Sequence, residues 1–437
     1  MPEIVDTQVD FEREPLAHPF GFKGGAMTEI WQVVAGLDGA SGHRATGLAV
    51  QSVLWSDAGL FAERAEGAGN CLMFLMTEFA LREARGRKFE TPPELLRELF
   101  PRVLEFGKQL TGRADLRPTF ALNALVAVDL AAWQLCARER EIADFDSLMR
   151  PLFGDVLGGR QERLGRIPLI SYGTTVEEVR RLVRDGCFFL KIKIGADPDG
   201  DGDRQKMLDW DRERLTALHR ELGALTCPYT ENGKVAYYLD ANGRYDSRER
   251  LLALIEHADR IGAGEHIHLL EEPFPEESEE DVSDLPIRIA ADESAHTAED
   301  AIRRMELGYG AVALKPIAKT LSMSLEVARE ARERGVPCFC ADLTVNPLMV
   351  EWNRNVAARI EPLPGLKVGV FETNGEQIYS NWDKMRSYHP LGERSWVCGK
   401  GGFFPLDEEY YRTGGGIFEP SPHYEARLAA YRKPDGR

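Results

Sequence analysis

Lys191 and Lys193 interrupt an otherwise apolar stretch that runs from Phe188 to Gly195. Side chains of a β-strand alternate between its two faces, so both ammonium groups would point to the same side. Burying two cations together is costly unless opposite charges lie close to them. The stretch is therefore either an edge strand with solvated lysines or a buried strand that presents both lysines to a functional site.

Three carboxylates and a further lysine end later apolar stretches of the chain. Asp240, Glu271 and Asp292 each close one of these stretches, and Lys315 closes the next. A single carboxylate in such a place is most simply a helix cap or a turn residue. Three in succession, with a lysine strand on either side, instead indicate a site. Carboxylate oxygens are the hard ligands that Mg²⁺ prefers, so the series predicts a magnesium site.

The lysines suit acid/base chemistry beside such an ion. A divalent cation and a second ammonium group both disfavour the charged form of a lysine and lower its pKa toward neutral pH. Lysines on opposite sides of a carboxylate substrate would each reach one face of its α-carbon. One would remove a proton to give an enediolate, and the other would return a proton or protonate a leaving group.

The elements that must position these residues alternate between strands and helices. Strands spaced by 20–30 residues with intervening helices are typical of a parallel sheet, and eight of them predict a (β/α)8-type barrel. The active site of such a barrel lies at the carboxyl ends of its strands, where the lysines and carboxylates stand. The expected strands are 167–172, 188–195, 235–240, 267–271, 287–292, 311–315, 337–341 and 366–372.

Three segments are expected along the chain. Residues 1–120 form an α+β capping domain, in which the glycine-rich run 19–26 reads as a mobile loop. Residues 121–375 form the barrel, and its polar stretch from 195 to 234 reads as a long connection with a solvated acidic loop. Residues 376–437 have little periodicity and are expected to return to the capping domain.

These motifs, taken in order, resemble the enolase superfamily. The closer resemblance is to its two-lysine branch of muconate-lactonising and dipeptide-epimerase-like proteins. The resemblance implies a modified TIM barrel with a cap that closes over the substrate. The motifs that carry it are Lys191-Ile192-Lys193, Asp240-Ala241-Asn242-Gly243, Glu271-Glu272-Pro273, Asp292-Glu293-Ser294 and Lys315.

The resemblance also assigns roles. It implies that Lys193 and Lys315 are the acid/base catalysts, and that Asp240, Glu271 and Asp292 hold one Mg²⁺. The mandelate-racemase branch uses a histidine on the seventh strand, and the segment Cys338 to Asp342 has none. The expected substrate contacts are Lys191, Asn242, Glu293, Lys319, Asp342 and Glu372.

Two assignments stay open. The third metal ligand is either Asp292 or Glu293, because only one of two neighbouring strand residues faces the ion. The second lysine of the family motif stands one position late, at Lys319, and the paired glycines that follow it in the family are missing. We favour Lys315 as the catalyst because it ends the apolar run where a barrel places its catalytic groups.

We therefore predict Mg²⁺-dependent removal of the α-proton of a small carboxylate, leading to racemisation or epimerisation of an acid or amino acid derivative. The main alternative is β-elimination of water from a hydroxy or sugar acid, which shares the first step. A Schiff-base aldolase leaves the carboxylates without a role. A non-catalytic metabolite-binding barrel would exchange no α-proton.

Composition restricts the partners. The chain has 437 residues, 43% of them hydrophobic, and a formal charge of −17. Such an acidic protein repels nucleic acid phosphates and anionic membranes, so neither is an expected partner. Seven cysteines in no repeating framework, no basic and apolar leader, and no long apolar run favour a cytoplasmic protein. We also expect a homo-oligomer.

Overall fold

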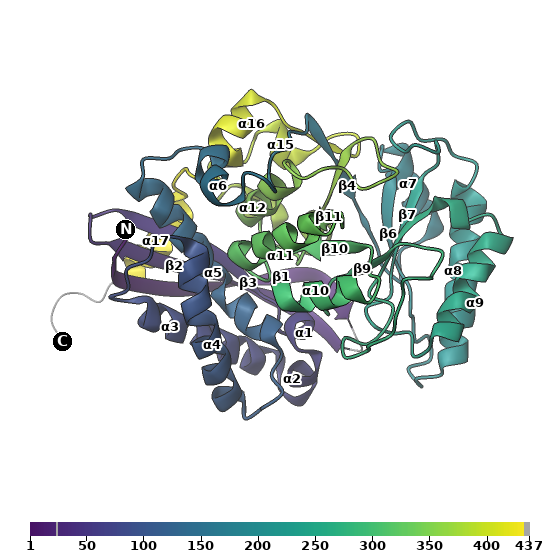
Figure 1. The fold of residues 1–437 in the computed structure, drawn as a ribbon, viewed down its shortest axis with the longest axis horizontal. Helices are drawn as coiled ribbons and strands as arrows, with labels where there is room; N and C mark the ends of the chain where they lie inside the picture. Colours follow the sequence, from purple (N-terminus) through teal and green to yellow (C-terminus); the bar gives the residue numbers. More distant parts are fainter. Residues whose placement is uncertain (23–24, 432–437) are drawn as a thin grey trace.

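The computed structural model describes residues 1–22 and 25–431, and it begins with a three-stranded antiparallel sheet (Figure 1). The sheet consists of β1 (Ile4–Phe22), β2 (Gly25–Gly39) and β3 (Arg44–Gln51), in that order. The pairing of β1 with β2 continues to Phe22 opposite Gly25. The prediction of a loop over 19–26 is therefore wrong for the described residues, and Lys23 and Gly24 lie outside them. Strand β1 has no counterpart in the sequence prediction.

Five helices follow this sheet. They are α1 (Val53–Ser56), α2 (Ala58–Glu63), α3 (Glu66–Ala84), α4 (Pro92–Thr111) and α5 (Pro118–Glu139). Helix α5 lies directly on β3, and a Cβ atom at Gly47 would come within 1.9 Å of the Ala127 carbonyl oxygen. Glycine thus permits a contact that no other residue would allow. Among the described helices, α5 alone is long and apolar enough to cross a membrane, and its apolar window is wholly buried in the protein.

Parallel strands form a barrel after the short helix α6 (Phe145–Phe153). Its first strand is divided by Pro168 into β4 and β5; β4 pairs with β12, and β5 pairs with β6. These two pairings close a ring of eight strands, which confirms the (β/α)8-type barrel with an α+β cap. The strands are β4 (Arg163–Ile167), β5 (Leu169–Ile170), β6 (Phe189–Lys193), β7 (Ala236–Asp240), β8 (Ile267–Glu271), β9 (Ile289–Ala291), β10 (Ala311–Leu314), β11 (Cys338–Cys340) and β12 (Gly369–Glu372).

Helices connect most of these strands on the outside of the ring. They are α7 (Val176–Arg184), α8 (Arg204–Leu222), α9 (Arg248–Arg260) with the short η1 (Gly264–His266), α10 (Ala298–Glu306), α11 (Leu321–Glu333) and α12 (Pro347–Ala357). Helix α8 occupies the middle of the segment that we expected to be a long polar connection. Its apolar residues Met207, Leu215 and Leu222 are buried, although charged residues separate them in the sequence.

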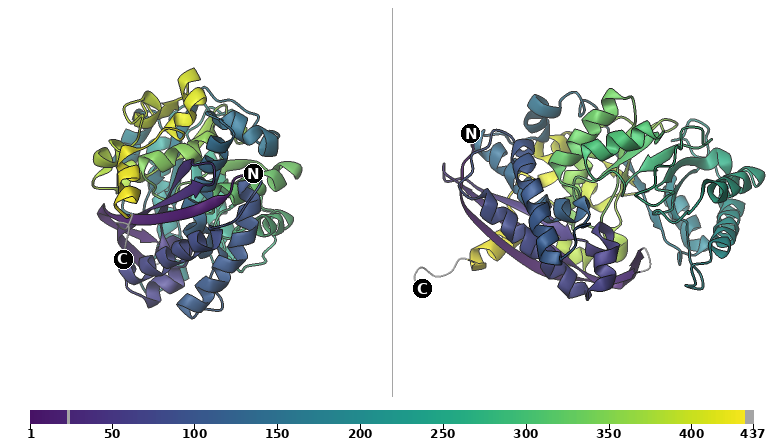
Figure 2. Two further views of the ribbon diagram at one scale, coloured as in Figure 1. Left: turned by 90° about the vertical axis from the view of Figure 1, so that its left-hand side faces the viewer. Right: turned by 60° about the horizontal axis from the view of Figure 1, so that its bottom comes forward.

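The C-terminal segment contacts both the cap and the barrel. It consists of α13 (Gly375–Ile378), α14 (Trp382–Arg386), α15 (Ser395–Cys398), β13 (Phe403–Pro405), α16 (Glu408–Thr413), η2 (Gly414–Gly416) and α17 (Pro422–Tyr431). Strand β13 pairs with β4 of the barrel, whereas α17 packs against β1 and β2 (Figure 2). The Arg427 guanidinium of α17 donates to the Phe11 carbonyl oxygen at 2.8 Å.

The domain boundaries remain a prediction. The boundary expected at residue 120 falls inside α5, whose buried face packs on β3 and β2. We therefore propose that the cap extends through α5 and that the barrel begins after it.

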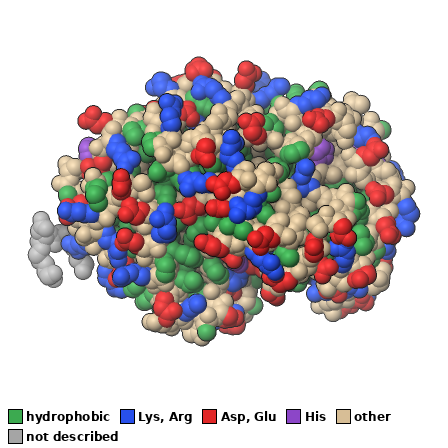
Figure 3. All heavy atoms as spheres, in the orientation of Figure 1, with side chains coloured by type: hydrophobic (Ala, Val, Ile, Leu, Met, Phe, Trp, Pro, Cys, Tyr) green, Lys and Arg blue, Asp and Glu red, His purple; other side chains and the backbone are tan. Residues whose placement is uncertain are grey.

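The face drawn in Figure 3 carries acidic and basic side chains interspersed with each other.

Candidate active site

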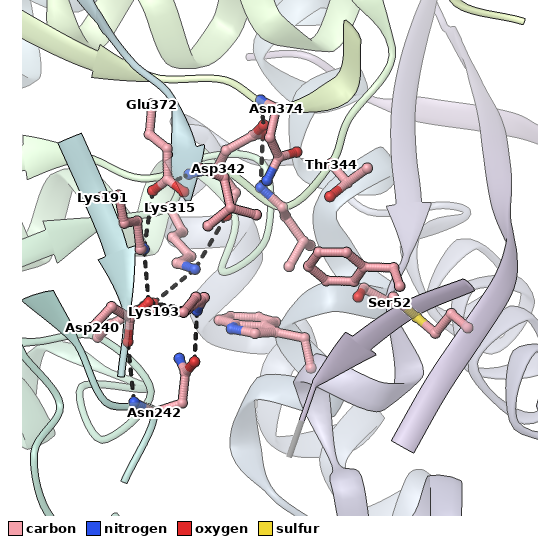
Figure 4. Close-up of a pocket in the computed structure, with 16 residues that line it drawn as sticks. Ser52, Lys191, Lys193, Asp240, Asn242, Lys315, Asp342, Thr344, Glu372 and Asn374 are labelled. Carbon is pink, nitrogen blue, oxygen red and sulfur yellow. Dashed lines mark hydrogen bonds and ion pairs between the residues drawn. The ribbon is translucent and has the colours of Figure 1, made fainter. Parts of the chain in front are cut away.

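The lysines and carboxylates meet in a pocket at the carboxyl ends of the barrel strands. Figure 4 shows Lys191, Lys193 and Lys315 pointing toward one another, with Asp240 between them. Phe20, Met27, Ser52 and Trp55 of the cap line the pocket as well. The pocket thus has a charged floor from the barrel and a largely apolar wall from the cap.

The two lysines of β6 point into the pocket, as their spacing predicts. Lys191 is 3% exposed, and its Nζ lies 3.1 Å from Asp240 Oδ2 and Glu271 Oε1 and 3.2 Å from Glu372 Oε2. Lys193 Nζ donates to Asp240 Oδ2 and to Asn242 Oδ1, each at 2.6 Å. The carboxylates that follow the neighbouring strands therefore offset the cost of burying these ammonium groups.

Asp240 and Asn242 form a small unit beyond the end of β7. The Asn242 backbone N–H donates to Asp240 Oδ1 at 3.1 Å, and its side-chain Nδ2 donates to Glu293 Oε1 at 2.9 Å. Asn242 has a φ of 44°, a left-handed conformation that asparagine tolerates better than most residues. Both oxygens of Asp240 are thus engaged by groups of the protein.

Three carboxylates lie close enough together to hold a metal ion. Oxygens of Glu271, Asp292 and Glu293 all lie within 4.8 Å of one another, and all three residues are buried. Glu271 Oε2 is a buried oxygen without a hydrogen-bond partner among the described residues. The sequence prediction included Asp240 in place of Glu293, but Asp240 is bound to the two lysines and lies outside this group.

Lys315 stands on the opposite side of the barrel from β6. Its Nζ lies 2.7 Å from Asp292 Oδ2 and 4.4 Å from the centroid of the Trp55 ring. Lys319 has a different environment: its Nζ donates to the carbonyl oxygens of Asp292 and Ala295. It lies behind Asp292 and does not line the pocket, so Lys315 is the lysine that the structure presents to it.

Asp342 and Glu372 close the site on the side of β11 and β12. Asp342 Oδ1 and Oδ2 accept the backbone N–H groups of Leu343, at 2.7 Å, and Asn374, at 2.6 Å. Glu372 Oε2 accepts from the Asp342 backbone N–H at 3.3 Å as well as from Lys191. Both carboxylates line the pocket, but their hydrogen bonds mainly hold the strand ends together.

The pKa values of two buried carboxylates in the site, Glu271 and Asp240, are shifted in opposite directions. Burial raises the pKa of Glu271 to about 7, although Lys191 opposes the shift. Burial also favours the neutral form of Asp240, but Lys191 and Lys193 outweigh it and hold the pKa of that carboxyl below its usual value.

The buried lysines show the same competition. Burial lowers the pKa of Lys191 and Lys315, but the carboxylates around them raise it further, so both pKa values lie above the usual one. From the sequence we expected lowered lysine pKa values. A lowered lysine pKa thus requires additional positive charge beside these carboxylates.

Several residues of the site could not be found by strand-end reasoning. Trp55 ends no barrel strand; it comes from the cap, which places it over Lys315. Thr344 lines the pocket with a φ of 59°, and its carbonyl oxygen accepts from the Tyr379 hydroxyl at 2.6 Å. Tyr379 in turn accepts from Gln32 of the cap strand β2 at 2.8 Å. The contact between Tyr379 and Gln32 joins residues that are 347 positions apart in the sequence.

The barrel also matches known proteins. Residues 174–367 match the enolase C-terminal domain-like family, which agrees with the resemblance that the motifs carry. No curated protein sequence matches the chain.

Solved structures share the whole fold. An enolase-superfamily protein from Listeria innocua has a TM-score of 0.64 at 18% identity, over 99% of this chain and 98% of that one. N-succinyl Arg/Lys racemase from Bacillus cereus has a TM-score of 0.65 at 14% identity, over 98% of both chains. The L-Ala-D/L-Glu epimerase from Bacillus subtilis has a TM-score of 0.60 at 17% identity, over 86% and 91%. Similarity at this level establishes the fold.

Proposed function

We propose that this protein is a Mg²⁺-dependent racemase or epimerase of the two-lysine branch, acting on an acid or amino acid derivative. One observation carries the proposal: Lys193 and Lys315 come from β6 and β10 and line the same pocket. These strands are four apart in a ring of eight, which places their ends on opposite sides of the barrel. Opposed bases are what inversion at an α-carbon needs.

The residues of the chain have complementary roles in this reaction. One lysine accepts the α-proton from its face of the substrate, and the other donates a proton to the opposite face. The C–H bond that breaks leaves its electron pair on the substrate, and the new C–H bond uses that pair, so no redox partner is required. Lys191, buried among three carboxylates, is the cation nearest to Lys193 along the strand and would attract the substrate carboxylate.

Carboxylates around Lys315 and Lys191 fit one magnesium ion. The donor set consists of hard oxygens, and the buried Glu271 Oε2 has no partner among the described residues. We propose Glu271 and Asp292 as ligands, with Asp240 as the third and Glu293 as the alternative third. When bound, the ion would supply positive charge that stabilises the anionic substrate after proton removal.

The side chains that the cap contributes to the pocket favour a substrate with an apolar substituent. Its contribution to the wall includes Phe20, Met27 and Trp55, and Leu169 and Leu343 of the barrel extend the apolar surface. A polyhydroxylated sugar acid would leave its hydroxyl groups unpaired against such a wall. Solved relatives in fold include a dipeptide epimerase from Enterococcus faecalis complexed with Mg and L-Leu-L-Tyr. This supports epimerisation over dehydration.

Proton exchange in D₂O tests the proposal. Amino acid derivatives, dipeptides and hydroxy acids are incubated with the protein and Mg²⁺ and followed by NMR. Deuterium at the α-carbon, with no product other than a stereoisomer of the substrate, is the expected result, and it should be lost on chelation and restored by Mg²⁺. Lys193→Ala and Lys315→Ala should abolish conversion between enantiomers, whereas Lys206→Ala, at an exposed lysine, should not.

Other outcomes would overturn this function. A keto product would indicate elimination of water. Full activity in both active-site variants would mean that these lysines are not the acid/base pair. Activity that persists in EDTA would exclude a required metal.

A further inference from the structure

The turn that carries Lys315 and Lys319 ends in a strained residue. Thr320 precedes α11 with a φ of 68° and a ψ of 152°, and it is completely buried. This region of backbone space is occupied almost only by glycine, and another residue there costs about 1–3 kcal/mol. The strain persists only if surrounding contacts hold the turn in place.

A carboxylate from the cap provides such a contact. Asp129 of α5 accepts from Ser322 twice, from the hydroxyl Oγ at 2.5 Å and from the backbone N–H at 3.0 Å. Trp133, one turn further along α5, donates its Nε1–H to the same hydroxyl at 3.0 Å. Ser322 lies two residues after Thr320, so α5 is hydrogen-bonded to the chain directly after the strained residue.

The contact also completes the start of α11. The first backbone N–H groups of a helix have no partner within the helix. Thr320 Oγ1 accepts from the Met323 N–H at 3.2 Å, and Asp129 accepts from the Ser322 N–H. A carboxylate at this end also interacts favourably with the helix dipole.

Burial of Asp129 is otherwise unfavourable. The residue is 4% exposed, and a buried carboxylate is costly without strong hydrogen bonds. Both of its oxygens accept from Ser322, directly beside the turn. A simple packing role would be served at lower cost by an apolar side chain.

We propose that Asp129 is a positioning residue, which holds the strained Lys315–Thr320 turn from the cap and thereby fixes Lys315 at its face of the substrate. The inference rests on the proposed function, because it assumes that Lys315 transfers a proton. It also predicts an asymmetry: Lys193 lies on β6, far along the ring from this turn, and does not depend on Asp129.

Face-specific proton exchange tests the inference. The substrate found in the exchange screen is supplied as each pure enantiomer in D₂O, and the initial rate of α-proton loss is measured for both. In Asp129→Asn and in Ser322→Ala, loss from the enantiomer whose proton faces Lys315 should slow by about ten- to hundredfold, since small displacements of a catalytic group have effects of this size. Loss from the other enantiomer and the KM should change little.

A second measurement needs no substrate. Hydrogen–deuterium exchange of the backbone amides of residues 320–323 should accelerate in both variants. Glu330→Gln is the matched control, because Glu330 lies further along α11 and is ion-paired with Arg334 at 2.7 Å. This variant should leave amide exchange in the turn and both proton-exchange rates unchanged.

The outcomes separate this inference from the proposed function. Equal slowing of both enantiomers would show a general structural role for Asp129 and overturn the inference, as would unchanged rates in Asp129→Asn and Ser322→Ala. If Asp129→Asn does not fold, Ser322→Ala decides alone. If instead Lys315→Ala retains exchange from both enantiomers, the proposed function itself fails.

Discussion

Lys315 Nζ lies 2.7 Å from Asp292 Oδ2, so the proposed acid/base group is ion-paired with a proposed metal ligand. The Asp292 carboxylate is buried, and burial opposes its charge, but Lys315, Lys319 and Lys191 together lower its pKa. A cation that binds at Asp292 must share this carboxylate with the lysine. Metal affinity and the position of Lys315 are therefore linked.

Removal of the Lys315 charge should tighten magnesium binding. In Lys315→Met, the ammonium group no longer competes for Asp292, and we expect the affinity for Mg²⁺ to rise by about tenfold, while enantiomer conversion is lost. Isothermal titration calorimetry measures the affinity. Lys206→Met, which removes a lysine paired with Asp199 and Asp201 on an exposed loop, should leave it unchanged. An unaltered affinity in Lys315→Met would place the ion away from Asp292.

The third magnesium ligand can be identified by a pair of isosteric substitutions. We expect Asp240→Asn to weaken Mg²⁺ binding by about tenfold or more, because the number of charged ligands sets the affinity of such sites. Glu293→Gln should have the smaller effect, because we propose Asp240 and not Glu293 as the third ligand. The reverse order in calorimetry would assign the ion to Glu271, Asp292 and Glu293, the three carboxylates that already lie together.

Arg117 connects Trp55 of the cap to the loop after β8 of the barrel, and its loss should weaken substrate binding. Its Nη1 donates to the Trp55 carbonyl oxygen at 3.2 Å, and its Nη2 is ion-paired with Glu276 in the loop after β8. Without this connection Trp55 is held less firmly over Lys315. We expect Arg117→Met to raise the KM for exchange several-fold with a smaller change in kcat.

The matched control for Arg117 is another arginine of the cap. Arg113 pairs with Glu63 and Asp115, which both belong to the cap. Arg113→Met should therefore leave the KM unchanged. An equal rise in both variants would mean that general loosening of the cap, and not its connection to Glu276, weakens binding.

The floor of the site was predictable because it follows from strand ends alone. Parallel strands bring their carboxyl ends to one rim, so Lys191, Lys193, Asp240, Glu271 and Lys315 could be gathered without knowing any distance. The partners of each charge could not be derived in this way. Lys319 follows Lys315 by one helical turn, yet its ammonium group is turned to backbone carbonyl groups, which no side-chain pattern reveals.

Elements rich in charged residues were the hardest to predict. Helix α12 is buried on every side, and its core includes Glu351 and Arg354, which pair with each other. Helix α8 shows the reverse, since its exposed charged residues obscure the spacing of its buried apolar ones. Strand β1 carries many charged residues and is 19 residues long, a length that its pairing with β2 supports. In each case tertiary contacts override local composition.

Asp211 of α8 should give the stability of the protein a distinctive pH dependence. Its oxygens accept from the Gly195 N–H at 3.0 and 2.8 Å and from the Tyr245 hydroxyl at 2.8 Å, which fixes the end of β6 two residues after Lys193. Burial nevertheless raises the pKa of Asp211 from 3.8 to about 7. Between these values the folded protein retains a proton that the unfolded chain has lost. Its free energy of unfolding should therefore fall as the pH rises from 4 to 7, by up to about 1.4 kcal/mol for each pH unit.

Urea denaturation of the protein and of Asp211→Asn isolates this contribution, because asparagine resembles the protonated carboxyl group and does not titrate. We expect the free energy of unfolding of the unmodified protein, relative to Asp211→Asn, to decrease between pH 4.5 and pH 7.5. Asp209→Asn, on the exposed side of the same helix, should show no such trend. If the unmodified protein instead gains stability over Asp211→Asn as the pH rises, its carboxylate is ionised in the folded state and stabilised by its three hydrogen bonds. The end of β6, and with it Lys193, would then be held by a charged group throughout the neutral range.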